Sequence, residues 1–246
     1  MADTILQGRG LTKRFGGLTA VSNVDIDVPA GSIYGLIGPN GARKSTLFRL
    51  IAGIMQPSSG SVTLRGVPLT NRAPSDVCIA GVVATHQIVR PFRTMTVIEN
   101  VMIGAFFGRR PQPRGRIDAR AIALETLRRC GIEDRADKPA RELNLAGQKR
   151  LEIARALATD PAVILLDEVL AGLNPTETDR TLDLVRAIRD GGATIVMVEH
   201  NLRAVRGLCS RLMVLVEGKT IAEGLPDDVL ADPAVVDAYL GNATHA

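Results

Sequence analysis

Residues 38–46 read GPNGARKST, and this stretch restricts the fold of the chain more than any other. It follows the short apolar run at 32–37, and four apolar residues come after it at helical spacing: Leu47, Leu50, Ile51 and Ile54. A glycine-rich turn between a strand and a helix is the setting of a phosphate-binding loop, whose pattern is G-x-x-x-x-G-K-[ST]. Arg43 occupies the second fixed glycine of that pattern. The sequence therefore predicts a phosphate loop with one unusual residue.

Apolar patterns elsewhere predict the sheets around this loop. Residues 24–28 and 61–66 alternate apolar and polar side chains, as half-buried antiparallel strands do. AVILLDE at 162–168 and TIVMVEH at 194–200 are continuous apolar runs that end in acid or histidine, which is typical of central parallel strands buried on both faces. Ligands bind beyond the carboxyl ends of such strands. RLMVLVEGKTIAEG at 211–224 predicts a hairpin that turns at Glu217, Gly218 and Lys219.

Composition excludes several classes of function. The net charge is only +4, the basic residues are dispersed, and aromatic residues make up 3% of the chain with no Trp, so no nucleic-acid partner is expected. The three cysteines are widely separated, a spacing that predicts neither a metal site nor disulfides. A reducing compartment is the simplest interpretation. The apolar runs are far shorter than the roughly 20 residues that span a bilayer. We therefore expect a cytoplasmic chain that reaches a membrane only through a partner.

The order of the motifs is more specific than any one of them. The phosphate loop, Gln87 after a strand, a helical region at 117–158, LLDE, AGLNP at 171–175 and VEH at 198–200 together resemble the ATP-binding cassette (ABC) ATPases over essentially the full chain. MTVIENVMIGA at 95–105 and the tail at 223–241 resemble the importer branch that serves branched-chain amino acids and similar amides. The resemblance implies an α/β cassette with a mainly parallel central sheet, an antiparallel β layer and a helical subdomain.

The resemblance also implies how ATP would be held. Phe15 stands where an aromatic ring stacks on adenine, although it could instead be a core side chain. Backbone N–H groups at a helix N-terminus would surround the β- and γ-phosphates, and Lys44 would neutralise them. The expected nucleotide-binding segment is Gly38, Pro39, Asn40, Gly41, Ala42, Arg43, Lys44, Ser45 and Thr46.

The residues for metal binding and hydrolysis follow from the same resemblance. Ser45 and Asp167 would bind Mg²⁺, and Glu168 would be the base for the attacking water. Gln87 would sense the metal and the γ-phosphate, with a merely exposed glutamine as the alternative. His200 would contact the γ-phosphate, although an isolated histidine is more often structural.

The chain departs from the family pattern in two places. If the backbone at Arg43 needs a positive φ, its side chain costs on the order of 1–3 kcal/mol. Either Arg43 turns outward and the loop binds ATP weakly, or it covers the phosphates and distorts the geometry of attack. LNLAG at 143–147 stands in place of the signature L-S-x-G-Q, with Asn144 for Ser and Ala146 for Gly. We expect both departures to slow hydrolysis.

We expect one ABC ATPase domain over 1–246, with a catalytic lobe at about 1–86 and 160–246 and a helical subdomain at about 87–159. The family resemblance implies transmembrane permease subunits and a second cassette as partners, with a substrate-binding protein involved indirectly. Asn174 would lie in the segment that communicates across the cassette dimer. The alternative is a degenerate cassette that acts as a structural partner of an intact ATPase. A soluble cassette protein of translation or DNA repair is disfavoured, because the chain has one loop and no basic tract.

Overall fold

The computed structural model describes residues 3–85, 91–109 and 115–240. Its contacts group the chain into two units, one formed by Met1–Pro74 with Ala193–Ala246 and the other by Ser75–Gly192. The phosphate-loop segment belongs to the first unit and the LLDE strand to the second. The predicted catalytic and helical lobes divide the chain by function and not by contacts. Their boundaries therefore stay a prediction.

The first unit contains the predicted antiparallel layer. It has the order β2-β1-β4-β5 and consists of β1 (Thr4–Phe15), β2 (Leu18–Pro29), β4 (Ser59–Leu64) and β5 (Val67–Pro68). The apolar members of the alternating stretch, Val24, Ile26 and Val28, are all buried. Since successive side chains of a strand face opposite sides, this alternation buries one face of β2. The expectation for 24–28 and 61–66 is confirmed.

The same unit contains parallel strands that carry the phosphate loop. β3 (Ile33–Ile37) lies between β8 (Thr194–Val198) and β9 (Arg211–Val216) and is parallel to both. All residues of β3 and β8 are buried, which explains their continuous apolar sequences. β10 (Lys219–Gly224) is antiparallel to β9. The turn between them uses Glu217 at φ 48° and Gly218 at φ 77°, which confirms the predicted hairpin.

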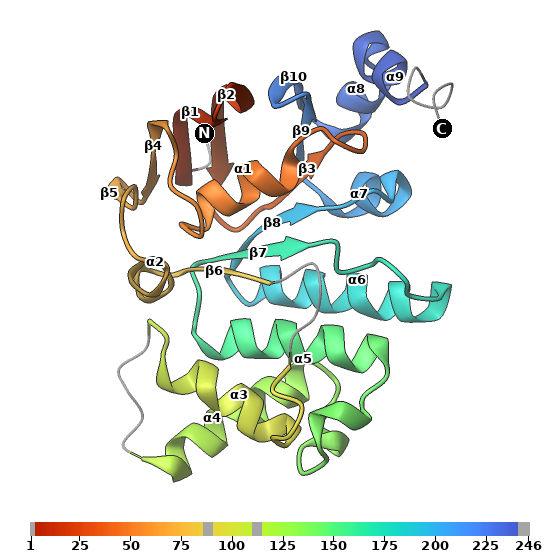
Figure 1. Ribbon diagram of the computed structural model, residues 1–246. Coiled ribbons are helices and arrows are strands. Elements are labelled where there is room, and N and C mark those ends of the chain that lie inside the picture. The colour runs from red at the N-terminus through yellow and green to blue at the C-terminus, as the bar shows by residue number, and fades with distance from the viewer. Residues whose placement is uncertain (1–2, 86–90, 110–114, 241–246) are drawn as a thin grey trace. The chain divides into compact units, whose positions relative to one another are not determined.

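Four helices accompany these strands in the first unit (Figure 1): α1 (Lys44–Ile51), α7 (Leu202–Leu208), α8 (Pro226–Ala231) and α9 (Pro233–Leu240). Leu47, Leu50 and Ile51 are buried on α1, as their spacing predicts. Ile54 was wrongly included in that pattern, because it lies beyond the helix and is 48% exposed. Gly53 has φ 68°, a left-handed conformation that commonly ends a helix.

The second unit combines one parallel strand pair with helices. β6 (Val82–Ala84) and β7 (Val163–Asp167) are parallel. The helices are α2 (Pro74–Ala80), α3 (Val97–Phe106), α4 (Arg116–Arg129), α5 (Leu145–Ala158) and α6 (Pro175–Asp190), with short 3₁₀ turns at Glu133–Arg135 and Ala140–Glu142. α3 contacts both α4 and α5, as Figure 1 also shows.

The helical region predicted at 117–158 is interrupted. Gly131 has φ 65° and follows α4, and the next helix, α5, begins at Leu145. The helical periodicity predicted for 117–158 is therefore confirmed for α4 and α5 and was wrong for the segment between them. Most of the proline-rich linker predicted at 109–116 lies outside the described residues, and Arg116 already belongs to α4.

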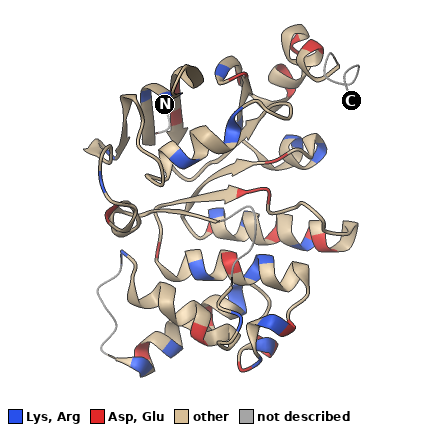
Figure 2. Cartoon of the chain, in the orientation of Figure 1, with Lys and Arg blue, Asp and Glu red and all other residues tan. Residues whose placement is uncertain are grey.

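Charged residues are dispersed over both units. Figure 2 shows Lys and Arg interleaved with Asp and Glu along the helices, without a continuous basic stripe. Several of these charges form exposed ion pairs, such as Arg128 with Glu125 at 2.7 Å. In the part of the chain that the structure describes, no helix is both long and apolar enough to cross a bilayer.

Candidate functional site

The predicted phosphate loop connects the end of β3 to the start of α1. The N–H groups of Thr46 and Leu47 donate to the Arg43 carbonyl at 3.0 and 3.1 Å and close the first turn of α1. The N-terminus of a helix favours anions, because its first N–H groups point outward and the helix dipole is positive there. Gly38 has φ 148°, and a Cβ there would overlap the Leu215 carbonyl oxygen. A side chain is therefore excluded at the first position of the loop.

Lys44 points back into this loop. Its side chain is buried, and Nζ donates to the carbonyl oxygens of Gly38 at 2.7 Å and Pro39 at 3.0 Å. Ser45 and Thr46 follow in the first turn of α1 and are partly exposed. The ammonium group is thus held within the loop, next to the helix N-terminus, where a bound phosphate would need it.

Arg43 has a backbone conformation that suits glycine. It has φ 73° and ψ 21°, the left-handed region, and it is the N-cap residue of α1. Its guanidinium has only donors and cannot cap the helix N–H groups. The side chain is exposed and lines a hollow of about 470 Å³ together with Asn40, Gly41 and Glu217. The side chain is therefore exposed beside the loop, and both outcomes considered from the sequence, a side chain turned outward and one that covers the phosphates, stay predictions.

We expect Arg43→Gly to be more stable than Arg43→Ala by about 1 kcal/mol, because only glycine adopts φ 73° without strain. Urea unfolding of the two variants, followed by circular dichroism, measures this difference. Equal stabilities would mean that residue 43 is not left-handed in solution. The wild type should lie close to Arg43→Ala, since both carry a Cβ.

Phe15 lies at the end of β1 and is 47% exposed, so it is not a core side chain. The Lys13 ammonium lies 5.4 Å from the centroid of its ring. An exposed ring with a cation over one face has its remaining surface available to a planar ligand. Its contact with adenine stays a prediction.

The acid pair lies at the carboxyl end of β7 in the second unit. Asp167 is buried, and its N–H donates to Thr85 Oγ1 at 3.1 Å. Glu168 is half-buried and has φ 49°, a strained conformation for a residue with a side chain. Its carbonyl oxygen accepts a hydrogen bond from Lys149 Nζ on α5 at 2.8 Å. The turn that carries the two acids is therefore fixed from two directions.

Sequence reasoning missed Thr85 and Lys149 as supports of this turn. Thr85 follows β6, and its own N–H donates to the Leu165 carbonyl at 2.9 Å, so it extends the pairing of β6 with β7. A polar residue after the apolar run was the available signal for Thr85. Lys149 gave no such signal, because its position on one side of α5 depends on tertiary packing.

We expect Thr85→Val to lower the free energy of unfolding by about 1–3 kcal/mol, because it leaves the buried Asp167 N–H without its acceptor. Thr85→Ser keeps the hydroxyl and should recover most of the loss. Denaturant titrations of the three proteins test this expectation. A valine variant as stable as the wild type would show that the hydroxyl does not support the acid turn.

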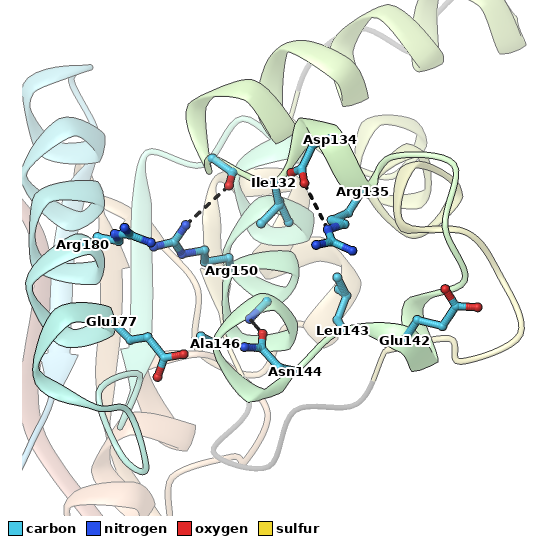
Figure 3. A pocket seen from close by; sticks show the side chains of 12 residues that line it. Ile132, Asp134, Arg135, Glu142, Leu143, Asn144, Ala146, Arg150, Glu177 and Arg180 are labelled. Atoms are coloured by element: carbon cyan, nitrogen blue, oxygen red, sulfur yellow. Dashed lines mark hydrogen bonds and ion pairs between the residues drawn. The ribbon is translucent and has the colours of Figure 1, made fainter.

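The replaced signature retains a helix cap. Asn144 is the N-cap of α5, and its side-chain oxygen accepts a hydrogen bond from the Gly147 N–H at 2.9 Å. Figure 3 shows this residue at the edge of a hollow of about 430 Å³, which Arg150 from α5 and Arg180 from α6 also line. Ala146 is buried. Asn144 thus performs the capping that a serine would perform, with an amide in place of the hydroxyl.

The other predicted site residues lie in both units. His200 is exposed and follows β8, which is parallel to β3, so His200 and the phosphate loop lie at the same edge of the first unit. Asn174 caps α6 in a reciprocal pair with Glu177, at 2.9 and 3.1 Å. Gln87 lies outside the described residues. The structure thus groups the loop with His200 in one unit and the acid pair with the signature helix in the other.

Comparisons with known proteins identify the family. A family described as ABC transporter matches residues 21–171, and one described as Branched-chain amino acid ATP-binding cassette transporter matches residues 219–245. The chain is 39% identical to the high-affinity branched-chain amino acid transport ATP-binding protein LivG of Salmonella typhimurium, over 99% of this chain and 100% of that one. It is 34% identical to BraF of Pseudomonas aeruginosa, a protein of the same description, over the same shares.

Solved structures agree with the sequence comparison. The ADP conformation of an ATP-binding cassette of an ABC transporter matches with a TM-score of 0.87 and 32% identity, over 98% of this chain and 100% of that chain. The predicted fold class, with parallel strands, an antiparallel layer and a helical region, is confirmed. The chain belongs to the ABC transporter family and is one of its ATP-binding cassettes.

Proposed function

We propose that this cassette binds and hydrolyses MgATP and thereby drives an importer of branched-chain amino acids or related amides. The observation that carries the proposal is the phosphate loop, which keeps a left-handed residue 43 and an inward-pointing Lys44 although Arg43 has replaced glycine. The names of LivG and BraF, which are similar over essentially the whole chain, support the choice of solute class.

The oxygen donors of the cassette suit Mg²⁺, a hard cation that prefers carboxylate and hydroxyl ligands. Ser45 in the first turn of α1 and Asp167 at the end of β7 would hold it, and Gln87 would complete the protein's share of the ligands. Bound Mg²⁺ would neutralise charge on the phosphates. Lys44 would bind the phosphates from within the loop.

Hydrolysis requires a base for the attacking water. Glu168 would accept a proton from that water while the water oxygen attacks the γ-phosphorus. The bond between the γ-phosphorus and the bridging oxygen breaks, and ADP leaves with its electrons. His200 would donate a hydrogen bond to the γ-phosphate, and Phe15 would stack on adenine. The strained turn at Glu168 is the kind of conformation that functional sites retain.

The cassette would act as part of a membrane complex. A second cassette would pair with it head to tail, so that each ATP lies between the loop of one chain and the signature of the other. Permease subunits would hold the pair at the cytoplasmic face of the membrane, and a substrate-binding protein would act on the permease from the other side. ATP binding would close the pair and hydrolysis would reopen it, which biases the permease between two states.

Equilibrium binding of MgATP to the wild type and to Arg43→Gly tests the nucleotide site, followed by hydrolysis assays with the permease subunits present. We expect both proteins to bind MgATP, because the Arg43 side chain is exposed and Lys44 stays within the loop. We expect Arg43→Gly to turn over faster, since glycine adopts φ 73° without strain and leaves no side chain beside the loop. If only Arg43→Gly binds, the natural loop is disabled and the chain serves as the structural partner of an intact cassette.

A further inference from the structure

The C-terminal helix α9 is fixed to the strands that flank the phosphate loop. α9 contacts β10, while the preceding α8 contacts both β9 and β10. Val235 is buried, and Tyr239 lies one helical turn later on the same face, because residues four apart on a helix are neighbours. The face of α9 that carries Val235 and Tyr239 is therefore turned toward the protein.

The hydroxyl of Tyr239 is buried next to the first residue of the phosphate loop. Its oxygen has no well-formed hydrogen bond within the described part of the chain. Burial raises the pKa of Tyr239, and the nearby backbone N–H of Gly38 opposes this rise. A buried hydroxyl without a hydrogen bond is costly, so a hydrogen bond from the nearby Gly38 N–H would stabilise it.

Gly38 connects this hydroxyl to the phosphate-binding lysine. Its carbonyl oxygen accepts the hydrogen bond from Lys44 Nζ at 2.7 Å. Its Cα lies so close to the Leu215 carbonyl that no side chain fits. Gly38 is therefore confined by β9 on one side, by Lys44 through its carbonyl and by Tyr239 near its N–H. A shift of Gly38 would move the atoms that hold Lys44.

We propose that Tyr239 is a positioning residue of the nucleotide site and acts through Gly38. When Lys44 leaves the Gly38 and Pro39 carbonyls to bind phosphate, the loop loses two of its internal hydrogen bonds. The Tyr239 oxygen then accepts a hydrogen bond from the Gly38 N–H and holds the loop at its β3 end. The inference rests on the proposed nucleotide site and adds to it a role for the C-terminal helix.

The chain offers a matched control for this proposal. It has two tyrosines and no tryptophan. Tyr34 on β3 is fully buried, and its hydroxyl lies beside Glu223 rather than at the loop. Tyr239→Phe and Tyr34→Phe each remove one buried hydroxyl and keep the ring. Only Tyr239→Phe removes the hydroxyl that faces Gly38.

The first experiment measures the Kd of the full-length chain for MgATP by calorimetry, well below the melting temperature of each variant. We expect Tyr239→Phe to raise the Kd about three- to tenfold, the effect of one net hydrogen bond. Tyr34→Phe should bind like the wild type. A role of Tyr239 in stability alone would lower its melting temperature and leave the Kd unchanged.

The second experiment uses the emission of Tyr239 itself. In Tyr34→Phe, Tyr239 is the single tyrosine, and magnesium pyrophosphate does not absorb where tyrosine is excited. We expect its emission to change on titration with magnesium pyrophosphate, with a midpoint equal to the Kd that calorimetry gives for magnesium pyrophosphate and the same variant. Constant emission at saturating pyrophosphate would mean that the hydroxyl does not respond to the loop and would overturn the proposal.

The outcomes separate this inference from the proposed function. If the wild type binds MgATP and Tyr239→Phe binds equally well, the positioning role is wrong and the nucleotide site stands. If both phenylalanine variants weaken binding to the same extent, the effect is a general one of buried hydroxyls, and the positioning role is again wrong. If the wild type binds no MgATP, both proposals are overturned.

Discussion

Glu168→Gln is expected to lower the steady-state rate of ATP hydrolysis about 10²–10⁴-fold while leaving the Kd for MgATP within about twofold of the wild type. Glutamine has the shape of glutamate but cannot accept a proton from the attacking water. Both side chains impose similar strain at φ 49°, so the turn that Thr85 and Lys149 support should persist. Phosphate release in the assembled complex measures the rate, and calorimetry measures binding.

Glu125→Gln is the control for the loss of one carboxylate in the same unit. Glu125 lies on α4, where its side chain is 60% exposed and pairs with Arg128. Its replacement should leave both hydrolysis and binding unchanged. If Glu168→Gln hydrolyses ATP at the wild-type rate, Glu168 is not the base, and another group near the γ-phosphate must accept the proton.

Lys44→Ala is expected to raise the Kd for MgATP about 100-fold or more. The Lys44 ammonium is buried within the loop, and hydrogen bonds to charged groups contribute about 1.5–3 kcal/mol each, so the loss of two contacts to phosphate accounts for this factor. The change also removes the donor to the Gly38 and Pro39 carbonyls, so circular dichroism should verify that the fold is intact.

Lys138→Ala removes the same charge from an exposed position in the second unit and is the matched control. It should bind MgATP as the wild type does. If Lys44→Ala binds as tightly as Lys138→Ala, the loop at 38–46 is not where the phosphates bind, and the proposed nucleotide site is wrong.

The residues that local patterns could locate were placed correctly relative to their strands. Asp167 ends a buried strand and Glu168 follows it, and His200 comes shortly after another buried strand. Apolar runs fix such positions, because a strand buried on both faces must end where charged side chains begin. The motif also predicted the loop conformation, since residue 43 is left-handed even though it is an arginine.

The wrong expectations arose where a single glycine ended a helix. Ile54 continues the apolar spacing of α1, yet Gly53 at φ 68° ends the helical path before it. Gly131 at φ 65° follows α4 in the same way, inside a region whose spacing looked helical throughout. Side-chain periodicity does not register such a stop, because it reports the faces of a helix and not the dihedral angles of its end.

The sequence by itself determined the family, the fold class and the order of the site residues, because each depends on local patterns and motif spacing. The tertiary structure decided that the Arg43 side chain is exposed, that Thr85 and Lys149 fix the acid turn, and that Tyr239 lies beside Gly38. The contacts of Thr85, Lys149 and Tyr239 join residues that are far apart in the chain, and the exposure of Arg43 depends on the elements around it. Their physical basis is packing between elements, which no local pattern encodes.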